Sequence, residues 1–322
     1  MRCNINYPGG IPIRIARRII KGKPFLDLNP ECAILTNDPN NLEENTIDIK
    51  GPEVNSKHKK VFSKLMNIDG LDVYLHGSQA DFTDTEFSDY DDLVIADCDV
   101  INKNNRSVWN AIKALNIVDM NFCRLDPLQH HGHWLVCKKS LYDYDASYMP
   151  LIVLHSAMVI CGPSIVKYRL NKEKTKEGLK RNIENTCSNI KSMAEKYFAK
   201  RMNLYELKGL VGSFALMPSY IYQIKGLELS KPESIKMAGD LFSKDAMDCI
   251  QWSTEMRVKW GFNTGHKSYR KFSKYVYLFT NPFLYRRFAS KYAPVIFPGP
   301  QVENEITNFK VDVFINEALE YV

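Results

Sequence analysis

The pattern of apolar and polar positions changes near residue 145. Before it, short apolar runs at 71–77 and 90–97 predict strands, and Ser56 is a plausible N-cap for a short helix over 57–67. After it, two long stretches, 171–201 and 204–226, have the length and spacing of helices. This order predicts an α+β N-terminal domain followed by an all-helical C-terminal domain.

Between the two strands and residue 145, the pattern predicts a helix and a pair of strands. Residues 105–116 have helical spacing, and 117–123 and 131–137 are expected to be paired strands joined by the turn RLDPLQH. The apolar stretch 148–162 is shorter than the roughly 20 residues that cross a membrane and contains a histidine, so a buried helix is expected there.

The domain boundaries follow from these elements. Residues 1–50 are rich in Pro, Asn and Gly around the basic apolar patch IPIRIARRIIKGKPF, which predicts an N-terminal extension. The expected division is an extension over 1–50, an α+β catalytic domain over 51–162 and a helical substrate-binding domain over 163–322.

Composition favours a globular protein in the cytoplasm. A hydrophobic fraction of 45% in 322 residues is enough for a sizeable core and about two domains. No apolar run at the N-terminus predicts a signal peptide, and no association with a membrane is expected. The eight cysteines contain no CxxC pair, which favours reduced thiols over disulfides.

One short segment carries most of the candidate chemistry. Residues 81–92 hold six acidic side chains and no basic one, directly after Gly77-Ser78. Carboxylates this close repel one another unless they face water or a cation. The segment is therefore either a solvated acidic loop or one side of a metal site.

The spacing within this segment favours the metal site. Asp89 and Asp91 stand two residues apart at the start of a strand, where alternation points both side chains the same way. Gly77 permits a phosphate to approach the backbone, and the Ser78 hydroxyl can bind it. A phosphate-binding turn and a carboxylate pair are the parts that metal-assisted phosphoryl chemistry needs.

These residues resemble a known signature. HGSQA…SDYDDLVI is similar to the motif of the DNA polymerase β-like nucleotidyltransferase superfamily, in which Gly-Ser is followed after about ten residues by Asp-x-Asp and an apolar strand. The resemblance covers roughly residues 56–140. It implies a nucleotidyltransferase fold for the N-terminal domain, with a small mixed sheet and helices, and an active site in the cleft between that domain and the helical one.

The resemblance also implies a mechanism. A nucleoside triphosphate such as ATP would bind with two Mg²⁺ ions, or Mn²⁺ in their place, about 3.5–4 Å apart, and an acceptor hydroxyl would attack the α-phosphorus. Asp89 and Asp91 would bridge both ions, while Gly77 and Ser78 would bind the phosphates that leave as pyrophosphate. Asp119, expected on the strand over 117–123, matches the family's third carboxylate, and Asp126 is the alternative.

The helical half holds a second, weaker resemblance. LKGLVGSFALMPSYIYQIKG is similar to the helix that covers the nucleotide in non-templated polymerases and small nucleotidyltransferases. Ser213 would approach the nucleotide, although Phe214 replaces the usual Tyr. Lys208 and Lys231 are candidate phosphate contacts. The alternative is that these residues belong to the helix core or the solvated surface.

The histidines of HHGHW, with Cys123 and Cys137, suggest a zinc site, but no CxxC pair anchors it. The alternative is a turn with hydrogen-bonded histidines.

The acceptor is predicted from charge. Residues 1–170 carry a net charge of −2 (19 basic, 21 acidic) and residues 171–322 one of +8 (24 basic, 16 acidic). Residues 256–302 contain nine basic and no acidic side chains, interleaved with aromatics, which suits a single-stranded nucleic acid. Arg270, Lys271 and Lys274 are the candidate contacts for an RNA or DNA 3′ end. An aminoglycoside-like small molecule, a protein hydroxyl as in toxin-type relatives, and a nucleic-acid-binding pseudoenzyme are the alternatives.

Overall fold

The computed structural model describes residues 42–261, 265–295 and 302–322, so the basic apolar patch of the N-terminal extension lies outside the described residues. The chain forms two compact units. Of the described residues, the first unit contains those of 42–84, Ser88–Glu173 and Tyr275–Arg287, and the second contains Thr85–Phe87 and those of 174–274 and 288–322. No helix in the described part of the chain is long and apolar enough to cross a membrane.

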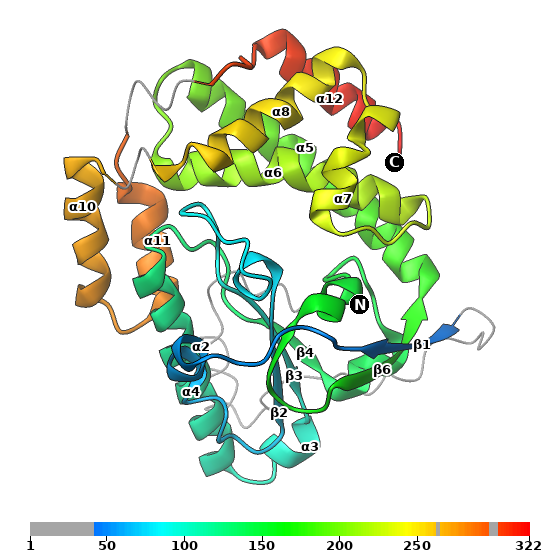
Figure 1. Ribbon diagram of the computed structural model, residues 1–322, viewed down its shortest axis with the longest axis vertical. Coiled ribbons are helices and arrows are strands. Elements are labelled where there is room, and N and C mark those ends of the chain that lie inside the picture. Colours follow the sequence, from blue (N-terminus) through cyan, green and yellow to red (C-terminus); the bar gives the residue numbers. More distant parts are fainter. Residues whose placement is uncertain (1–41, 262–264, 296–301) are drawn as a thin grey trace. The chain divides into compact units, whose positions relative to one another are not determined.

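The first unit is built on a four-stranded mixed sheet (Figure 1). Its strands, in the spatial order β4-β3-β2-β5, are β4 (Trp134–Cys137), β3 (Asp91–Ala96), β2 (Leu71–His76) and β5 (Met158–Cys161). The central strand β2 is antiparallel to both neighbours, whereas β3 and β4 are parallel. The two strands predicted at the signature motif are therefore confirmed within one residue at each end.

Alternation along the strands divides the core of this unit into two clusters. Leu75 and Val94 face one cluster, where they pack with Phe62 and Phe122 of the helices α2 (Ser56–Phe62) and α4 (Asn105–Leu125). Tyr74 and Leu93, one residue along each strand, face the other cluster. Successive strand residues point to opposite faces, so one face of the sheet is covered by helices α2 and α4.

The prediction of a strand over 117–123 is wrong, because α4 continues through it to Leu125. Its buried positions, which include Val108, Ile112, Leu115, Val118 and Phe122, keep the three- and four-residue spacing of one helix. The segment contains no glycine or proline, and the first proline, Pro127, comes after the helix has ended. The predicted hairpin therefore does not exist, and β4 pairs in parallel with β3 instead.

The expected buried helix over 148–162 is also wrong. It is replaced by the 3₁₀ turn η5 (Leu151–Ser156) and the edge strand β5, which pairs with β2. A short apolar run gives no reliable distinction between a buried helix and a buried strand. Here residues 158–161 form a strand because they pair with the edge of β2 that β3 leaves open.

A second, two-stranded sheet joins segments far apart in the sequence. Strand β1 (Leu42–Asp48) pairs antiparallel with β6 (Ile165–Asn171), and the core cluster around Tyr74 includes Ile47 and Val166. The described end of the predicted N-terminal extension is thus part of the first unit. The remaining elements of this region are short: α3 (Cys98–Ile101) and the 3₁₀ turns η3 (Gly77–Gln79) and η4 (Lys138–Asp143).

The described part of the second unit is helical, although strand β6 and residues 275–287, within the predicted helical domain of 163–322, belong to the first unit. Two long helices dominate it, α5 (Lys172–Phe198) and α6 (Leu204–Ile224), and the latter starts with a capping box of Asn203 and Glu206. The other helices are α7 (Lys231–Lys236), α8 (Lys244–Val258), α10 (Lys267–Ser273), α11 (Pro282–Tyr292) and α12 (Asn308–Leu319).

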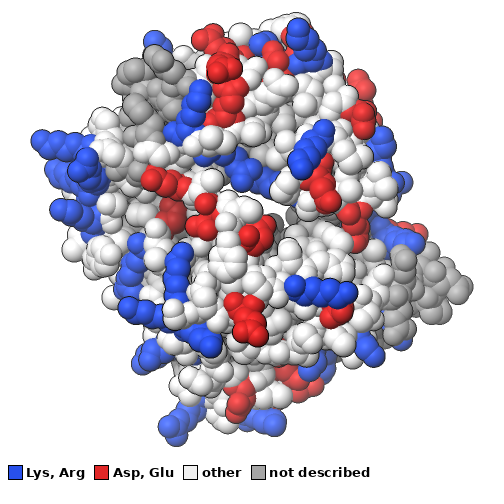
Figure 2. Space-filling view, in the orientation of Figure 1, with Lys and Arg blue, Asp and Glu red and all other residues white. Residues whose placement is uncertain are grey.

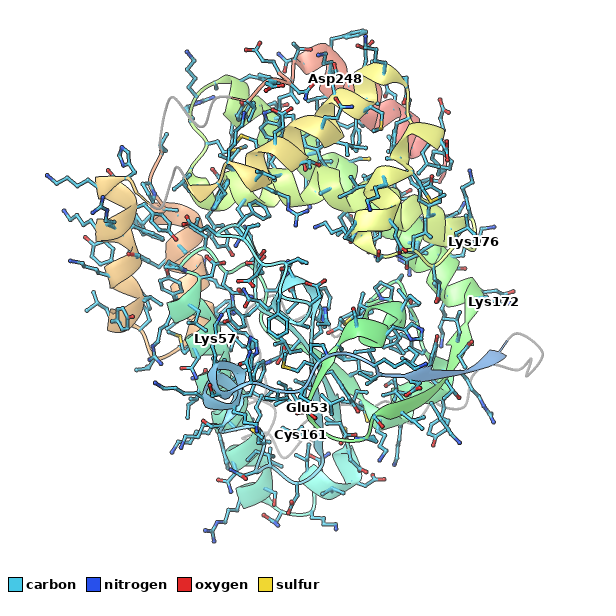
Figure 3. The ribbon with its side chains drawn as sticks, viewed as in Figure 1. Glu53, Lys57, Cys161, Lys172, Lys176 and Asp248 are labelled. Carbon is cyan, nitrogen blue, oxygen red and sulfur yellow. The ribbon has the colours of Figure 1, made fainter. Side chains whose placement is uncertain are left out.

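Aromatic side chains fill the core of this unit. Phe214 of α6 packs edge-on against Phe314 of α12 and Trp252 of α8, with ring centroids 5.0 and 6.0 Å away. Near the surface, the Lys310 ammonium forms an ion pair with the Asp248 carboxylate of α8, with the nitrogen and oxygen 2.6 Å apart (Asp248 is labelled in Figure 3). The mixed α+β class of the chain is therefore confirmed.

Helix α11 begins in one unit and ends in the other. The first unit includes Tyr275–Arg287. This range covers most of the 3₁₀ turn η7 (Lys274–Leu278) and the first residues of α11. Tyr285 donates a hydrogen bond from its hydroxyl to the Pro127 carbonyl at 2.7 Å, and the Asn116 side chain donates one to the Thr280 carbonyl at 2.8 Å. A segment from the C-terminal half of the chain thus packs on α4 and the turn that follows it.

Candidate active site

The Gly-Ser pair forms a tight turn at the end of β2. Gly77 has a φ of +69°, a conformation that side-chain-bearing residues seldom adopt, and it starts the 3₁₀ turn η3. Its carbonyl accepts hydrogen bonds from the amides of Ala80 and Asp81, at 2.9 and 3.3 Å. Gly77 is exposed and Ser78 half-buried, so the turn is accessible to solvent at Gly77.

Asp91 lies beside this turn. It is the first residue of β3 and pairs with His76, the last residue of β2. A Cβ atom on Gly77 would lie 3.6 Å from the Asp91 Oδ2 atom. The phosphate-binding candidate and one acidic candidate, fourteen positions apart in the sequence, therefore meet at one end of the sheet.

Asp89 precedes the strand and is half-buried, like Asp91. Carboxylate oxygens are the ligands that Mg²⁺ takes from proteins, and it often binds through one or two of them together with substrate phosphates. Asp89 and Asp91 supply that donor chemistry. Within the described residues, no three His, Cys, Asp or Glu side chains gather as a metal site, so a third protein ligand is not assembled there.

Asp92, the next residue, has a structural role. It is fully buried on the opposite face of β3, and both its oxygens lie within hydrogen-bonding distance of His133 Nδ1, at 2.9 and 2.7 Å. The other ring nitrogen of His133 lies 2.9 Å from the Leu115 carbonyl, which can only accept. An imidazolium donates to both partners, so the geometry favours a buried ion pair.

The pKa of His133 agrees with this interpretation. Burial alone disfavours the charged ring, but attraction to Asp92 and the hydrogen bonds to Asp92 and Leu115 outweigh it and raise the pKa to about 9. His133, the residue before β4, is therefore a buried, hydrogen-bonded histidine. Of the two interpretations of HHGHW, the structure favours the hydrogen-bonded histidine for this residue, since Asp92 and the Leu115 carbonyl engage both of its ring nitrogens.

Asp119, the predicted third carboxylate, is held by an arginine. It lies in α4 and not in a strand, and its side chain is buried. Arg286 of α11 donates from Nη1 to Oδ2 at 3.0 Å and from Nη2 to Oδ1, a bidentate ion pair. The same Nη2 group donates to the His131 carbonyl at 2.6 Å. Both oxygens of Asp119 are therefore bound by a cation from the protein itself.

The Asp119 carboxylate nevertheless lies at the same end of the sheet as Asp91. In the parallel pair of strands, Trp134 is the partner of Leu93. Gly132, two residues before Trp134, therefore lies level with Asp91, two residues before Leu93. A Cβ atom on Gly132 would lie 2.9 Å from Asp119 Oδ2, so the carboxylate occupies the space that a side chain there would need. Asp126, the alternative, accepts a hydrogen bond from the Leu128 amide at 2.9 Å in the turn after α4.

Two buried polar side chains near the Gly-Ser turn, His58 and Gln79, were missed in the sequence. His58 is 2% exposed and neither ring nitrogen has a hydrogen-bond partner in the described part of the chain, and the same holds for the Gln79 amide oxygen. Burial, with the nearby charge of Lys57, lowers the pKa of His58 (Figure 3 labels Lys57). Tyr90 and Phe82 flank His58, each with its ring centroid 6.4 Å away, and Phe82 is held at a φ of +59°.

In the second unit, Lys208 is buried and contacts an aromatic ring. Its ammonium lies 5.4 Å from the centre of the Phe87 ring, and the Arg257 guanidinium lies 5.3 Å from the same centre. Trp260 packs edge-on against Phe87 at 5.0 Å. Two cations and an indole thus hold Phe87, a residue of the acidic segment, in the helical unit.

The other predicted contacts in this unit have mixed outcomes. Ser213 is half-buried and donates its hydroxyl to the Gly209 carbonyl one turn earlier, at 2.9 Å. Phe214 is completely buried in the core, so the helix-core alternative is correct for this residue. Lys231 starts the short helix α7 and is half-buried.

The predicted nucleic-acid residues lie on and after α10. Arg270, Lys271 and Lys274 are exposed, and the Arg270 guanidinium donates to the Gly265 carbonyl at 3.1 and 2.7 Å. Figure 2 shows Lys and Arg side chains gathered over α10. Arg286, one of the nine basic residues in the acid-free stretch, is buried with Asp119 and is not part of this surface.

The residues that sequence reasoning missed are partners rather than motif members. Arg286 and the cations that contact Phe87 belong to segments remote from the motif, and a hydrogen-bonded His133 was one of the two interpretations of HHGHW, but its partner Asp92 was not identified. Comparison of the chain with protein-family models, with curated proteins and with solved structures gave no match.

Proposed function

We propose that this protein is a Mg²⁺-dependent nucleotidyltransferase of the DNA polymerase β-like type. It transfers a nucleoside monophosphate from an NTP to an acceptor hydroxyl and releases pyrophosphate. The observation that carries the proposal is the adjacency of the Gly77 turn and the Asp91 carboxylate, separated by 3.6 Å from the Cβ position of that glycine. A phosphate group bound at the turn would lie next to the carboxylates that hold its metal ion.

Each residue of this site has a defined task. Asp89 and Asp91 bind Mg²⁺, which, when bound, polarises the phosphoryl oxygens and neutralises the leaving pyrophosphate. The Ser78 hydroxyl donates to a phosphate oxygen, and the exposed backbone of η3 allows the triphosphate to approach. Lys208 and Ser213 remain candidate nucleotide contacts from the helical unit.

Asp119 has a conditional role as the third carboxylate. It would bind the second metal ion and orient or deprotonate the attacking hydroxyl only after Arg286 releases at least one of its oxygens. With Arg286 in place, Asp119 anchors α11 to α4. The proposal therefore rests on Asp89 and Asp91 first and on Asp119 second.

We propose an RNA or DNA 3′ end as the acceptor. The support is the exposed basic surface of α10, which contains Arg270, Lys271 and Lys274 and lies in a stretch without acidic residues. Exposed lysine and arginine side chains bind a phosphate backbone and release its counterions. A small-molecule or protein acceptor, or binding without catalysis, are the outcomes that the experiments below distinguish.

The decisive experiment supplies the full chain with each α-labelled NTP, Mg²⁺, and separate pools of total RNA, DNA and protein. We expect label in a nucleic-acid pool, and Asp89→Asn or Asp91→Asn should lower transfer at least about a thousandfold, since losing a ligand charge removes several kcal/mol of transition-state stabilisation. Asp69→Asn, an exposed carboxylate of the same unit, is the matched control.

The possible results separate the alternatives. Label in the protein pool, or in an added aminoglycoside, would replace the nucleic-acid acceptor. Turnover of the Asp91→Asn variant within about tenfold of the wild type would contradict the metal site. Oligonucleotide binding with neither turnover nor metal-dependent NTP binding would identify a pseudoenzyme.

The basic surface is tested by salt dependence. Binding of a single-stranded oligonucleotide should weaken with salt at a log–log slope of about −0.7 per phosphate contacted. Changing Arg270, Lys271 and Lys274 together to Ala should reduce that slope by about 2 and leave NTP binding intact. The control removes three exposed lysines of the first unit, Lys59, Lys60 and Lys64. Equal slopes for both triple variants would exclude α10 as the contact surface.

A further inference from the structure

Two buried cysteines meet at the end of the sheet opposite to the carboxylates. Cys98, the first residue of α3, and Cys137, the last residue of β4, have their sulfur atoms 2.9 Å apart. They are 39 positions apart in the sequence, and the parallel register brings them together because Cys137 pairs with Ala96 at the end of β3. Their exposed fractions are 5% and 0%.

The contact between the two thiols is close enough for covalent pairing. A disulfide joins its sulfur atoms at about 2.05 Å, so bond formation requires a movement on the order of one ångström. Cys98 begins α3 and Cys137 ends β4, at the same end of the four-stranded sheet. Among the described residues, the other cysteines form no hydrogen bond to a second sulfur: Cys123, Cys161, Cys187 and Cys249.

The surroundings shift the pKa values of the two thiols in opposite directions. The Cys98 thiol donates to Cys137, and this bond, with the backbone N–H groups of Lys139, Cys98 and Ser140, lowers the pKa of Cys137 although burial opposes it. The same bond, burial and the charges of Asp97 and Asp99 raise the pKa of Cys98. Cys137 is therefore the sulfur that carries thiolate character, and Cys98 holds the proton.

The charged side chains next to the two cysteines form ion pairs. Lys139 bonds Asp99 at 2.9 Å, and Lys138 lies 3.7 Å from Asp97. The two acidic side chains beside Cys98 are thus compensated by lysines that follow Cys137. The positive environment of the Cys137 sulfur comes from backbone N–H groups rather than from an adjacent side-chain cation.

We propose that Cys98 and Cys137 form a redox-active dithiol that hydrogen peroxide, or an organic hydroperoxide, oxidises to an intramolecular disulfide. The Cys137 thiolate attacks the terminal peroxide oxygen, the O–O bond breaks, and sulfenic acid forms with release of hydroxide from hydrogen peroxide or of an alkoxide from an organic hydroperoxide. The Cys98 sulfur then attacks the sulfenic sulfur. The S–O bond breaks, the S–S bond forms, and the Cys98 proton leaves with the hydroxyl as water.

The disulfide would tie α3 to the end of β4. It would close a loop that contains α4, and closure of a loop this long reduces the conformational entropy of the unfolded chain. Oxidation should therefore raise the midpoint of thermal unfolding by about 5 °C or more. The modification is independent of nucleotidyl transfer, because both cysteines lie at the far ends of β3 and β4 from Asp91.

The test maps the bond on the full chain. The reduced protein is exposed to hydrogen peroxide, denatured with N-ethylmaleimide, digested without reductant and analysed by mass spectrometry. We expect a cross-linked pair of peptides containing Cys98 and Cys137, and loss of two alkylation sites. The matched control is Cys161→Ser, a half-buried cysteine of the same sheet, which should leave the cross-link unchanged (Cys161 is labelled in Figure 3).

Single variants assign the two sulfurs. In Cys98→Ser, peroxide should leave a sulfenic acid on Cys137 that dimedone traps, whereas Cys137→Ser should leave Cys98 reduced. Dimedone labelling of Cys98 instead would overturn the assigned order. If the variants do not fold, the wild-type map decides: both cysteines alkylated after peroxide treatment, or either one linked to Cys3 or Cys32, would overturn the proposal.

Discussion

Asp91 and Asp92 are adjacent in the sequence and belong to different regions of the molecule. Asp91 is half-buried beside the Gly77 turn at the end of the sheet, while Asp92 is fully buried under α4 with His133. The strand period of two separates them, since neighbouring side chains point to opposite faces. The Asp91 carboxylate is partly exposed to solvent, whereas the Asp92 carboxylate is buried and paired with His133.

This difference changes how the acidic segment is understood. Six carboxylates without a basic neighbour look like one cluster in the sequence, but the chain distributes them. Asp92 has a buried histidine, the Asp84 carboxylate accepts a hydrogen bond from Gln79 at 3.1 Å, and Asp81 caps the amide of Thr83. The like-charge repulsion that suggested a metal site is therefore partly relieved by partners and by separation.

The largest expected effect tests this contrast directly. Asp92→Asn should lower the free energy of unfolding by roughly 3–5 kcal/mol, because it leaves His133 buried without its counter-charge. Asp91→Asn should change it by less than about 1 kcal/mol, since that side chain is partly solvated. Urea denaturation of both variants measures the difference. Equal losses would mean that the two faces of β3 are not energetically distinct.

The second prediction asks whether Asp119 belongs to the site or to the fold. Asp119→Asn and Arg286→Met should each destabilise the protein by roughly 3–5 kcal/mol, and the double variant should cost much less than their sum, because the two groups form one buried pair. Arg287→Met, an exposed neighbour on α11, is the control and should be near neutral.

Activity separates the two roles of Asp119. If it becomes a metal ligand, Arg286→Met should lower the Mg²⁺ concentration needed for half-maximal transfer, because the arginine no longer competes for the carboxylate. An unchanged Mg²⁺ requirement, with transfer retained in the Asp119→Asn, Arg286→Met double variant, would remove Asp119 from the catalytic set.

The smallest effect is the pH dependence of stability. His133 has a folded pKa of about 9 against about 6.5 when unfolded, so its contribution is fully present below pH 6.5 and is lost as the pH rises through 9. The loss is on the order of 3 kcal/mol. Burial lowers the pKa of His76 to about 4, so its contribution is present above pH 6.5 and is lost as the pH falls through 4.

Together these two histidines predict maximal stability near pH 6.5. Urea denaturation across pH 4–9 checks the curve, and a His133→Gln variant should lose the decline on the alkaline side while keeping the one on the acidic side. A decline between pH 6.5 and 9 that persists in His133→Gln would assign it to another group.

Local patterns in the sequence determined several features correctly. The strands β2 and β3, the glycine turn between them and the long helices α5 and α6 follow from side-chain period, capping and the special conformation of glycine, which act over a few residues. The adjacency of Gly77 and Asp91 follows as well, because two strands joined by one segment are expected to lie side by side. The chemical hypothesis depends only on these local facts.

Tertiary structure alone decided the remainder. Residues 117–123 continue the helical spacing of 105–116, but their apolar side chains also allow a strand, and the packing of Phe122 against Phe62 and the sheet decides for one continuous helix. The partners of Asp119, Asp92 and Cys137 lie 167, 41 and 39 positions away, respectively. No local period encodes such a distance, since long-range pairing is set by the burial of whole faces, and a buried charge or thiol then bonds whatever partner the fold brings to it.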